Sequence, residues 1–154
     1  MGEAAENSFS RLLSKKGTVR PASTSQQIRH IDFILTTSKG EKLRYEVKAR
    51  KRVSRSEDNP TDELVWLEFL NVRGDAGWLY GNANFIAFER EKDFVIVDRI
   101  KLKTMAETKC DLALKVNSPS NALYKGYTRF GRSDLISIVK MPDIVEIADE
   151  VWVK

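Results

Sequence analysis

Two runs of alternating apolar and polar residues, joined by a short turn, constrain the fold more than any other part of the sequence. They are Gln27–Thr36 and Glu41–Arg50, and Gly40 ends the stretch between them. Side chains of a strand alternate between the two faces of a sheet, and a three-residue hairpin loop favours glycine where the backbone needs φ > 0. The pattern therefore predicts an antiparallel β-hairpin with one apolar face and one polar face.

The length of the loop sets which residues of the hairpin face each other. With residues 38–40 as the loop, Thr37 pairs with Glu41, and the same register puts Asp32 directly opposite Glu46. Two like charges opposite each other destabilise a hairpin. A divalent cation between the two carboxylates would reverse that effect.

The polar face of the hairpin therefore indicates a metal-dependent active site. Mg²⁺ or Mn²⁺ takes hard oxygen ligands, which Asp32, Glu46 and the carbonyl of Val47 would supply. Lys48 would orient the attacking water or stabilise charge on a phosphate. We predict Asp32, Glu46 and Lys48 as the catalytic residues. The alternative is a solvated strand face that carries an ordinary pair of opposite charges.

Asp32, followed after a hairpin by Glu46-Val47-Lys48, resembles the PD-(D/E)XK nuclease superfamily, which includes restriction enzymes, recombination nucleases and Holliday junction resolvases. The spacing of 14 residues and the helix expected before the hairpin are similar to the compact, resolvase-like members. The likeness runs to about Asp98, and Ile31 stands where the motif usually has proline. The resemblance implies an α/β fold with a restriction-endonuclease-like mixed central sheet flanked by helices, and a Mg²⁺-dependent DNA endonuclease.

Three further side chains are candidates for this site. Resolvase-like members often draw a third acidic ligand from the N-terminal helix, which here would be Glu6, or Glu3 one turn before it. The alternative is that both acids favour the positive end of the helix. Glu68, within an apolar strand, would complete the site or pair with Arg73. His30, on the polar face of the hairpin, would contact phosphate or water, or serve as a structural residue.

Two basic stretches are candidates for nucleic-acid binding, because Lys and Arg neutralise phosphates and aromatic rings stack on unpaired bases. The first follows the second strand of the hairpin and contains Arg50, Lys51, Arg52 and Arg55. The second runs from Tyr124 to Arg132 and contains Lys125, Arg129 and Arg132. A solvated loop is the alternative for the first stretch, and aromatic packing is the alternative for the second.

The length and composition narrow the class of protein. A chain of 154 residues predicts one domain, residues 1–154, and a net charge of +4 suits a polyanionic partner. One Cys and one His exclude a zinc site built from these residues. No apolar run reaches the length of a membrane span, and the start lacks the basic and apolar regions of a signal peptide. We therefore expect a cytoplasmic protein that does not enter a membrane.

The remaining elements follow from periodicity and from turn residues. Helices are predicted over residues 3–16, 99–114 and 142–149, and further strands over residues 63–70, 85–88, 94–97 and 135–139. The polar residues 18–26 are predicted to form a loop, and residues 78–80 a short helix or turn.

We expect a single-domain endonuclease that acts on branched DNA, such as a Holliday junction, in recombination or repair. The small size leaves no separate domain for reading a base sequence. Junction resolvases work as dimers, so a homodimer is expected, and residues 78–80, if exposed, would form its interface. The alternatives are a restriction-type or RNA-cutting nuclease and a non-catalytic nucleic-acid-binding protein on the same fold.

Overall fold

A computed structural model describes residues 2–53 and 60–154, and the chain divides into two compact units. The first unit contains Met1–Arg50, Gly81–Arg99 and Ala148–Lys154, and the second contains Lys51–Tyr80 and Ile100–Ile147. Neither unit is one continuous stretch of sequence. The expectation of a single domain stays a prediction.

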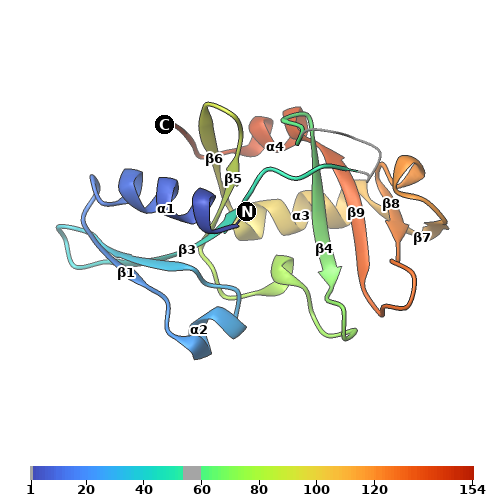
Figure 1. Ribbon diagram of the computed structural model, residues 1–154, viewed down its shortest axis with the longest axis horizontal. Coiled ribbons are helices and arrows are strands. Elements are labelled where there is room, and N and C mark those ends of the chain that lie inside the picture. The colour runs from blue at the N-terminus through green and yellow to red at the C-terminus, as the bar shows by residue number, and fades with distance from the viewer. Residues whose placement is uncertain (1, 54–59) are drawn as a thin grey trace. The chain divides into compact units, whose positions relative to one another are not determined.

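The first unit is built on a six-stranded sheet with the strand order β1-β2-β3-β5-β6-β10 (Figure 1). Its elements are α1 (Gly2–Leu13), β1 (Thr18–Pro21), α2 (Thr24–Ile28), β2 (Phe33–Thr36), β3 (Lys42–Lys48), β5 (Phe85–Glu89), β6 (Asp93–Asp98) and β10 (Glu150–Val153). Strands β3 and β5 are parallel, and the other neighbours are antiparallel. The sheet is therefore mixed.

The predicted hairpin is confirmed in β2 and β3. The two strands pair antiparallel in the predicted register, with Leu35 opposite Leu43. In the loop, the Thr37 N–H donates to the Glu41 carbonyl over 2.9 Å, and Gly40 has a φ of +83°. Glycine adopts this left-handed conformation without steric cost, so the sequence fixes the turn at this residue.

Helix α1 packs an apolar stripe against one face of this sheet. Ala5, Phe9 and Leu13 recur every fourth residue and are buried, because that spacing keeps side chains on one face of a helix. The Phe9 ring lies 5.6 Å from Tyr45 and stacks on Trp152 at 5.4 Å. The same cluster contains the predicted apolar face of the hairpin, formed by Phe33, Leu35, Leu43, Tyr45, Val47 and Ala49.

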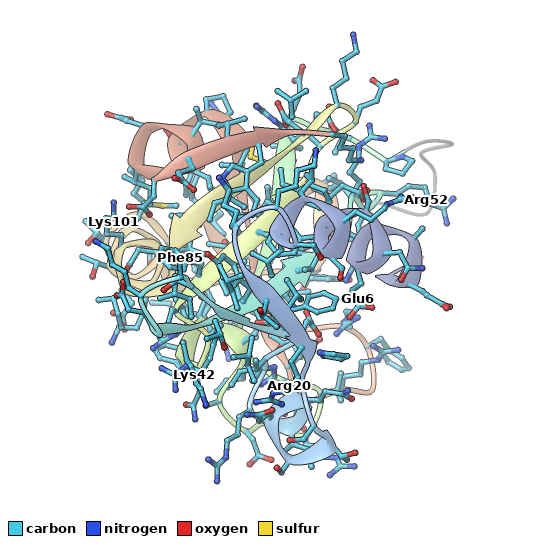
Figure 2. The ribbon with its side chains drawn as sticks, turned by 90° about the vertical axis from the view of Figure 1, so that its left-hand side faces the viewer. Glu6, Arg20, Lys42, Arg52, Phe85 and Lys101 are labelled. Carbon is cyan, nitrogen blue, oxygen red and sulfur yellow. The ribbon has the colours of Figure 1, made fainter. Side chains whose placement is uncertain are left out.

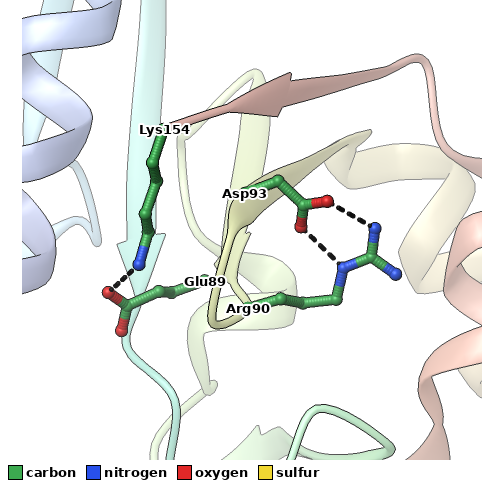
Figure 3. Close-up of polar contacts among 4 residues, drawn as sticks. All are labelled: Glu89, Arg90, Asp93 and Lys154. Carbon is green, nitrogen blue, oxygen red and sulfur yellow. Dashed lines mark hydrogen bonds and ion pairs between the residues drawn. The ribbon is translucent and has the colours of Figure 1, made fainter.

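Two ion pairs hold the end of the sheet where β5 turns into β6 (Figure 3). Arg90 donates to both carboxylate oxygens of Asp93, at 2.7 and 2.9 Å. Lys154, next to β10, lies 2.9 Å from Glu89 on β5. Such partly exposed pairs contribute about 1 kcal/mol each, and they neutralise both cations locally.

The second unit contains a four-stranded sheet with the order β4-β9-β8-β7. Its elements are β4 (Leu64–Leu70), η1 (Trp78–Tyr80), α3 (Arg99–Lys109, whose first residue belongs to the first unit), β7 (Asp111–Val116), η2 (Pro119–Asn121), β8 (Lys125–Tyr127), β9 (Leu135–Lys140) and α4 (Met141–Ile147). Strands β7 and β8 are parallel, and the other pairs are antiparallel. The mixed α/β class is confirmed, but the strands form two sheets instead of one central sheet.

Several predicted boundaries are wrong. Residues 18–26 contain β1 and most of α2 instead of a loop, and residues 27–32 are not a strand, since β2 begins only at Phe33. Helix α3 ends at Lys109, where β7 follows, and β10 was not predicted. Of residues 78–80, Trp78 and Leu79 are buried and Tyr80 is exposed, so the segment does not present the expected apolar patch as a whole. No helix of the described chain is long and apolar enough to cross a membrane.

Candidate active site

Asp32 lies just before β2, where the pairing with β3 becomes irregular. Its N–H donates to the Tyr45 carbonyl over 2.8 Å, although Tyr45 is the partner of Phe33. Two residues of one chain segment then face one residue of the other, as in a β-bulge. The predicted position of Asp32 directly opposite Glu46 is therefore wrong. A bulge changes the direction of a side chain, and such bulges are frequent beside active sites.

The redirected carboxylate binds the backbone of the neighbouring strand. The Val47 N–H donates to Asp32 Oδ2 over 2.7 Å, a short bond to a charged acceptor. In an extended strand, the N–H and carbonyl of one residue face the same edge. The Val47 carbonyl therefore faces the Asp32 side of β3, as the predicted metal site requires.

Two of the predicted catalytic residues, Glu46 and Lys48, form an ion pair. They lie two residues apart on β3 and share a face, and Lys48 Nζ is 2.8 Å from Glu46 Oε1. Glu46 is only 5% exposed. A buried carboxylate is costly unless a charge or hydrogen bond compensates it, and the ammonium group of Lys48 supplies that compensation.

Glu6 reaches this site from α1 (labelled in Figure 2). Burial raises the pKa of its carboxyl group, and the charge of Asp32 and a hydrogen bond with Asp32 raise it further. Lys48 acts in the opposite direction and lowers the pKa of Glu6. The structure therefore brings Glu6, rather than Glu3, into hydrogen-bond contact with Asp32.

His30 reaches the site by a different route from the one predicted. It follows the C-terminus of α2 in the left-handed conformation, with a φ of 64°. Its N–H donates to the Gln27 carbonyl over 3.0 Å, and the Ile31 N–H donates to the Gln26 carbonyl over 3.1 Å. These two bonds form a Schellman motif, in which this position is usually glycine. The turn places His30 Nδ1 3.9 Å from Glu46 Oε1.

Gly81 is a supporting residue that the sequence analysis missed. A Cβ at this position would lie 2.8 Å from the Cβ of His30 and 3.1 Å from the Arg29 carbonyl. The next residue fastens the same segment, because the Asn82 N–H donates to the Arg29 carbonyl over 3.0 Å. The close approach joins segments about 50 residues apart, so no local sequence pattern signals it.

The other predicted site residues make contacts of their own. Glu68 belongs to the second unit, where its Oε1 accepts a hydrogen bond from the Trp78 N–H over 3.3 Å. The Arg50 N–H donates to Glu89 Oε1 over 3.0 Å in the first unit. Lys51 and Arg52 belong to the second unit, and Arg55 lies outside the described residues.

The second basic stretch contains one cation that is already neutralised. Arg129 Nε lies 2.5 Å from Asp134 Oδ2, and Asp134 is 1% exposed. Lys125 and Arg132 are exposed. The structure therefore separates a structural arginine from two cations that face solvent.

The three acidic side chains of the site, Glu6, Asp32 and Glu46, do not all contact one another in the contacts described above. Glu6 contacts Asp32, and Glu46 contacts Lys48. Within residues 2–53 and 60–154, no group of three or more His, Cys, Asp or Glu side chains is arranged to hold a metal ion. The donor chemistry nevertheless fits Mg²⁺, which prefers carboxylate oxygens. Burial is the largest cause of the raised pKa of Glu6, and the nearby Asp32 raises it further; a cation between the two carboxyl groups would relieve this second effect.

No protein-family model, curated protein or solved structure matches this chain. The case for a function therefore rests on the contacts of Glu6, Asp32, Glu46 and Lys48.

Proposed function

We propose that the protein is a Mg²⁺- or Mn²⁺-dependent DNA endonuclease of the PD-(D/E)XK type that acts on branched DNA. The observation that carries the proposal is the ion pair of the buried Glu46 with the partly exposed Lys48, beside an Asp32 carboxylate that binds the backbone of Val47. The residues of the motif thus lie on one strand and at the end of its hairpin partner.

The arrangement of the first unit supports the same proposal. The motif lies on a hairpin that packs against α1, and strand β3 of the hairpin pairs with the parallel strand β5. The irregular pairing at Asp32 also suits a site, because a regular ladder would use the Val47 N–H for the backbone instead of the carboxylate.

Each residue has a defined role in this proposal. Glu6, Asp32, Glu46 and the Val47 carbonyl would hold the metal, which when bound polarises the scissile phosphate and lowers the pKa of a water ligand. Lys48 keeps a positive charge beside the site and stabilises the negative charge that develops on phosphate. The bond from the Val47 N–H fixes the orientation of the Asp32 carboxylate before any ligand arrives.

The test is cleavage of supercoiled plasmid, linear duplex, single strand, flap and four-way junction, with Mg²⁺, Mn²⁺, Ca²⁺ or a chelator. We expect cleavage with Mg²⁺ and Mn²⁺, fastest on the junction, and none with Ca²⁺ or the chelator. Asp32→Asn, Glu46→Gln and Lys48→Ala should each slow cleavage about 10³-fold, because each removes a charge needed in the transition state. DNA binding by these variants should change far less.

Matched controls come from the same hairpin. Glu41→Gln and Lys42→Ala change exposed residues of the same chemical types, and both variants should cleave like the wild type. Thermal unfolding of every variant shows whether lost cleavage reflects lost structure. Full cleavage in excess chelator, or by a folded Lys48→Ala variant, would contradict the proposal.

A nucleic-acid-binding protein that cuts nothing is the second candidate. The separation of the acids into Glu6 with Asp32 and Glu46 with Lys48 favours it, because a bound cation needs these carboxylates together. DNA binding without cleavage of any of the five substrates would establish this alternative.

A further inference from the structure

Phe130 is the most exposed large apolar side chain in the described part of the protein. Its relative exposure is 103%, whereas Ile28, the next residue of this kind, reaches 75%. Single exposed apolar residues are common on protein surfaces, so exposure alone assigns no role. The surroundings of Phe130 in the second unit make it distinctive.

The other two aromatic residues of the stretch have structural partners. The Tyr124 hydroxyl donates to the Asp143 carboxylate and accepts a hydrogen bond from the Lys140 N–H. The Tyr127 ring lies 5.8 Å from the ring of Trp66. Packing therefore accounts for both tyrosines but not for Phe130.

Phe130 lies in a hydrogen-bonded β-turn between strands β8 and β9. The Arg132 N–H donates to the Arg129 carbonyl over 3.1 Å, so residues 129–132 form a β-turn with Phe130 at its second position. Gly131 at the third position has a φ of +74°, as a type II turn requires.

The base of this turn is fixed by the buried residue Asp134. Its Oδ1 accepts from the Arg129 N–H over 2.9 Å, and its carbonyl accepts from the Thr128 hydroxyl over 2.7 Å. A second loop is fastened beside it, because the Ser133 N–H donates to the Val72 carbonyl over 3.2 Å. The exposed ring therefore stands on a turn whose base is held by several hydrogen bonds.

The charged residues near the turn are mainly basic. Arg132 and Lys125 are exposed on the same segment, and the adjacent loop that follows Val72 contains exposed Arg73 and exposed Asp75. The one acidic residue of residues 124–134 is Asp134, which is 1% exposed and paired with Arg129. An exposed aromatic ring among cations is the combination that holds single-stranded nucleic acid, by base stacking and phosphate neutralisation.

We propose that the turn of residues 129–132 is a binding site for single-stranded nucleic acid, in which an unpaired base stacks on Phe130 and Arg132 contacts the adjacent phosphate. The inference deepens the proposed function, on which it rests for the choice of DNA as the partner. A site of this kind selects the unpaired nucleotides that branched DNA exposes, and a continuous duplex offers its bases no access to the ring.

Binding of fluorescent oligo(dT) and of a blunt duplex of equal length, measured by anisotropy in EDTA, tests this site without cleavage. Phe130→Ala should weaken oligo(dT) binding about 5-fold to 150-fold, the range expected for one stacked base. Phe130→Trp should preserve the affinity, and Phe130→Leu, which keeps an apolar side chain without an aromatic face, should behave like Phe130→Ala. Binding of the duplex should change less than about twofold, within the usual context dependence of surface substitutions.

Two further variants give matched controls. Leu114→Ala removes another exposed apolar residue of the second unit, 54% exposed on β7, and should leave binding unchanged. Arg132→Gln should lower the slope of log affinity against log salt by about 0.7 for oligo(dT). Sedimentation of wild type and Phe130→Ala shows whether the residue governs self-association instead.

The outcomes separate this inference from the proposed nuclease activity. Oligo(dT) binding that falls with Phe130→Ala supports the site even if no substrate is cleaved. Unchanged oligo(dT) binding, an equal loss on oligo(dT) and duplex, or a change in oligomeric state alone would overturn the site, whether or not the protein cleaves DNA. Absence of oligo(dT) binding by the wild type at low salt would overturn it as well.

Discussion

Glu6 and Asp32 are two acidic residues that the fold holds together at a cost. A carboxyl group with a raised pKa favours its neutral form in the folded state, so its ionisation opposes folding. For Glu6 the causes are burial and then Asp32, with Lys48 offsetting part of the effect. Such an arrangement is expected where ligand binding, rather than stability, determines the choice of residue.

We predict that Glu6→Gln stabilises the metal-free protein by about 0.5 kcal/mol at neutral pH, since repulsion between partly solvated carboxylates is modest. The sign follows from the direction of the shift. Ionised Glu6 destabilises the wild type above its raised pKa, and this penalty disappears as the pH falls and the group takes up a proton. The advantage of Gln should therefore shrink on acidification, which thermal unfolding across pH would measure.

The same variant tests the role of Glu6 toward a cation. Mg²⁺ should raise the unfolding temperature of the wild type more than that of Glu6→Gln, because binding to the folded state alone stabilises it. Exposed Glu3→Gln is the matched control on the same helix. An advantage of Gln that does not vary with pH, or equal stabilisation of both proteins by Mg²⁺, would contradict the assignment.

At the scale of one element, the residue that follows the C-cap of α2 adopts a backbone conformation that suits glycine. That residue is His30. Left-handed backbone is uncommon for residues with a Cβ, although His is among the types enriched there. The helix itself is short and begins with a capping box formed by Ser23 and Gln26. Its role is thus to direct His30 toward Glu46, at some expense in stability.

We predict that His30→Gly stabilises the protein by about 1 kcal/mol, the cost of left-handed backbone in a residue with a side chain. This corresponds to roughly 2–4 °C in the unfolding temperature of a chain of this size. Cleavage should fall about 10-fold or more, since the imidazole near Glu46 is lost. His30→Asn is the control, because Asn tolerates the same backbone but removes the ring. Wild-type cleavage by both variants would make His30 structural.

Three of the four strands that the sequence failed to predict are edge strands: β1 and β10 form the edges of the first sheet, and β7 forms an edge of the second. The fourth, β8, lies between β9 and β7 but is only three residues long, too short to show a periodicity. An edge strand needs little apolar surface: only Trp152 is buried in β10, and no residue of β7 is. Interior strands such as β3 and β6 contain the apolar periodicity that predicts them. The missed helix α2 did have a local signal, the capping box Ser23-Thr-Ser-Gln26.

The site was predictable to the extent that it is local. Glu46 and Lys48 share a face because they lie two residues apart on one strand, which alternation alone dictates. The bulge at Asp32, the turn that carries His30 and the approach of Gly81 depend on hydrogen bonds and packing between distant segments. No periodicity of a single strand contains that information, so the predicted pairing of Asp32 with Glu46 was wrong.

At the scale of the whole molecule, the proposed chemistry and the proposed single-strand site belong to different units. Glu6, His30, Asp32, Glu46 and Lys48 lie in the first unit, and Phe130 and Arg132 lie in the second. Affinity for single strands and cleavage should therefore respond to different substitutions. The net charge of +4 belongs to the whole chain and attracts any polyanion.

We predict that replacing Arg50, Lys51 and Arg52 together with Gln weakens duplex binding and reduces its salt dependence. Each lost phosphate contact lowers the magnitude of the log–log salt slope by about 0.9, so the slope should fall by up to about 2.7. Because Lys48→Ala should prevent cleavage, the test compares duplex binding by Lys48→Ala alone with duplex binding by Lys48→Ala combined with the triple replacement. Titrations of both proteins at several salt concentrations would give the two slopes.

The controls are Arg90→Gln and Lys154→Gln, because Asp93 and Glu89 already neutralise these cations (Figure 3). Neither substitution should change the slope. Equal changes from the control pair and the triple variant would indicate a general effect of net charge rather than a binding face.

The stack of Phe9 on Trp152 has a consequence for how the protein forms during synthesis. The two rings lie 5.4 Å apart in space, but Trp152 leaves the ribosome 143 residues after Phe9. The apolar stripe of α1 therefore lacks this partner until residue 152 has been made, and contacts between residues so distant in sequence form slowly. A nascent chain with such a stripe exposed is a natural client for chaperones and is prone to aggregate. Slowing translation between residues 9 and 152 should prolong that exposure.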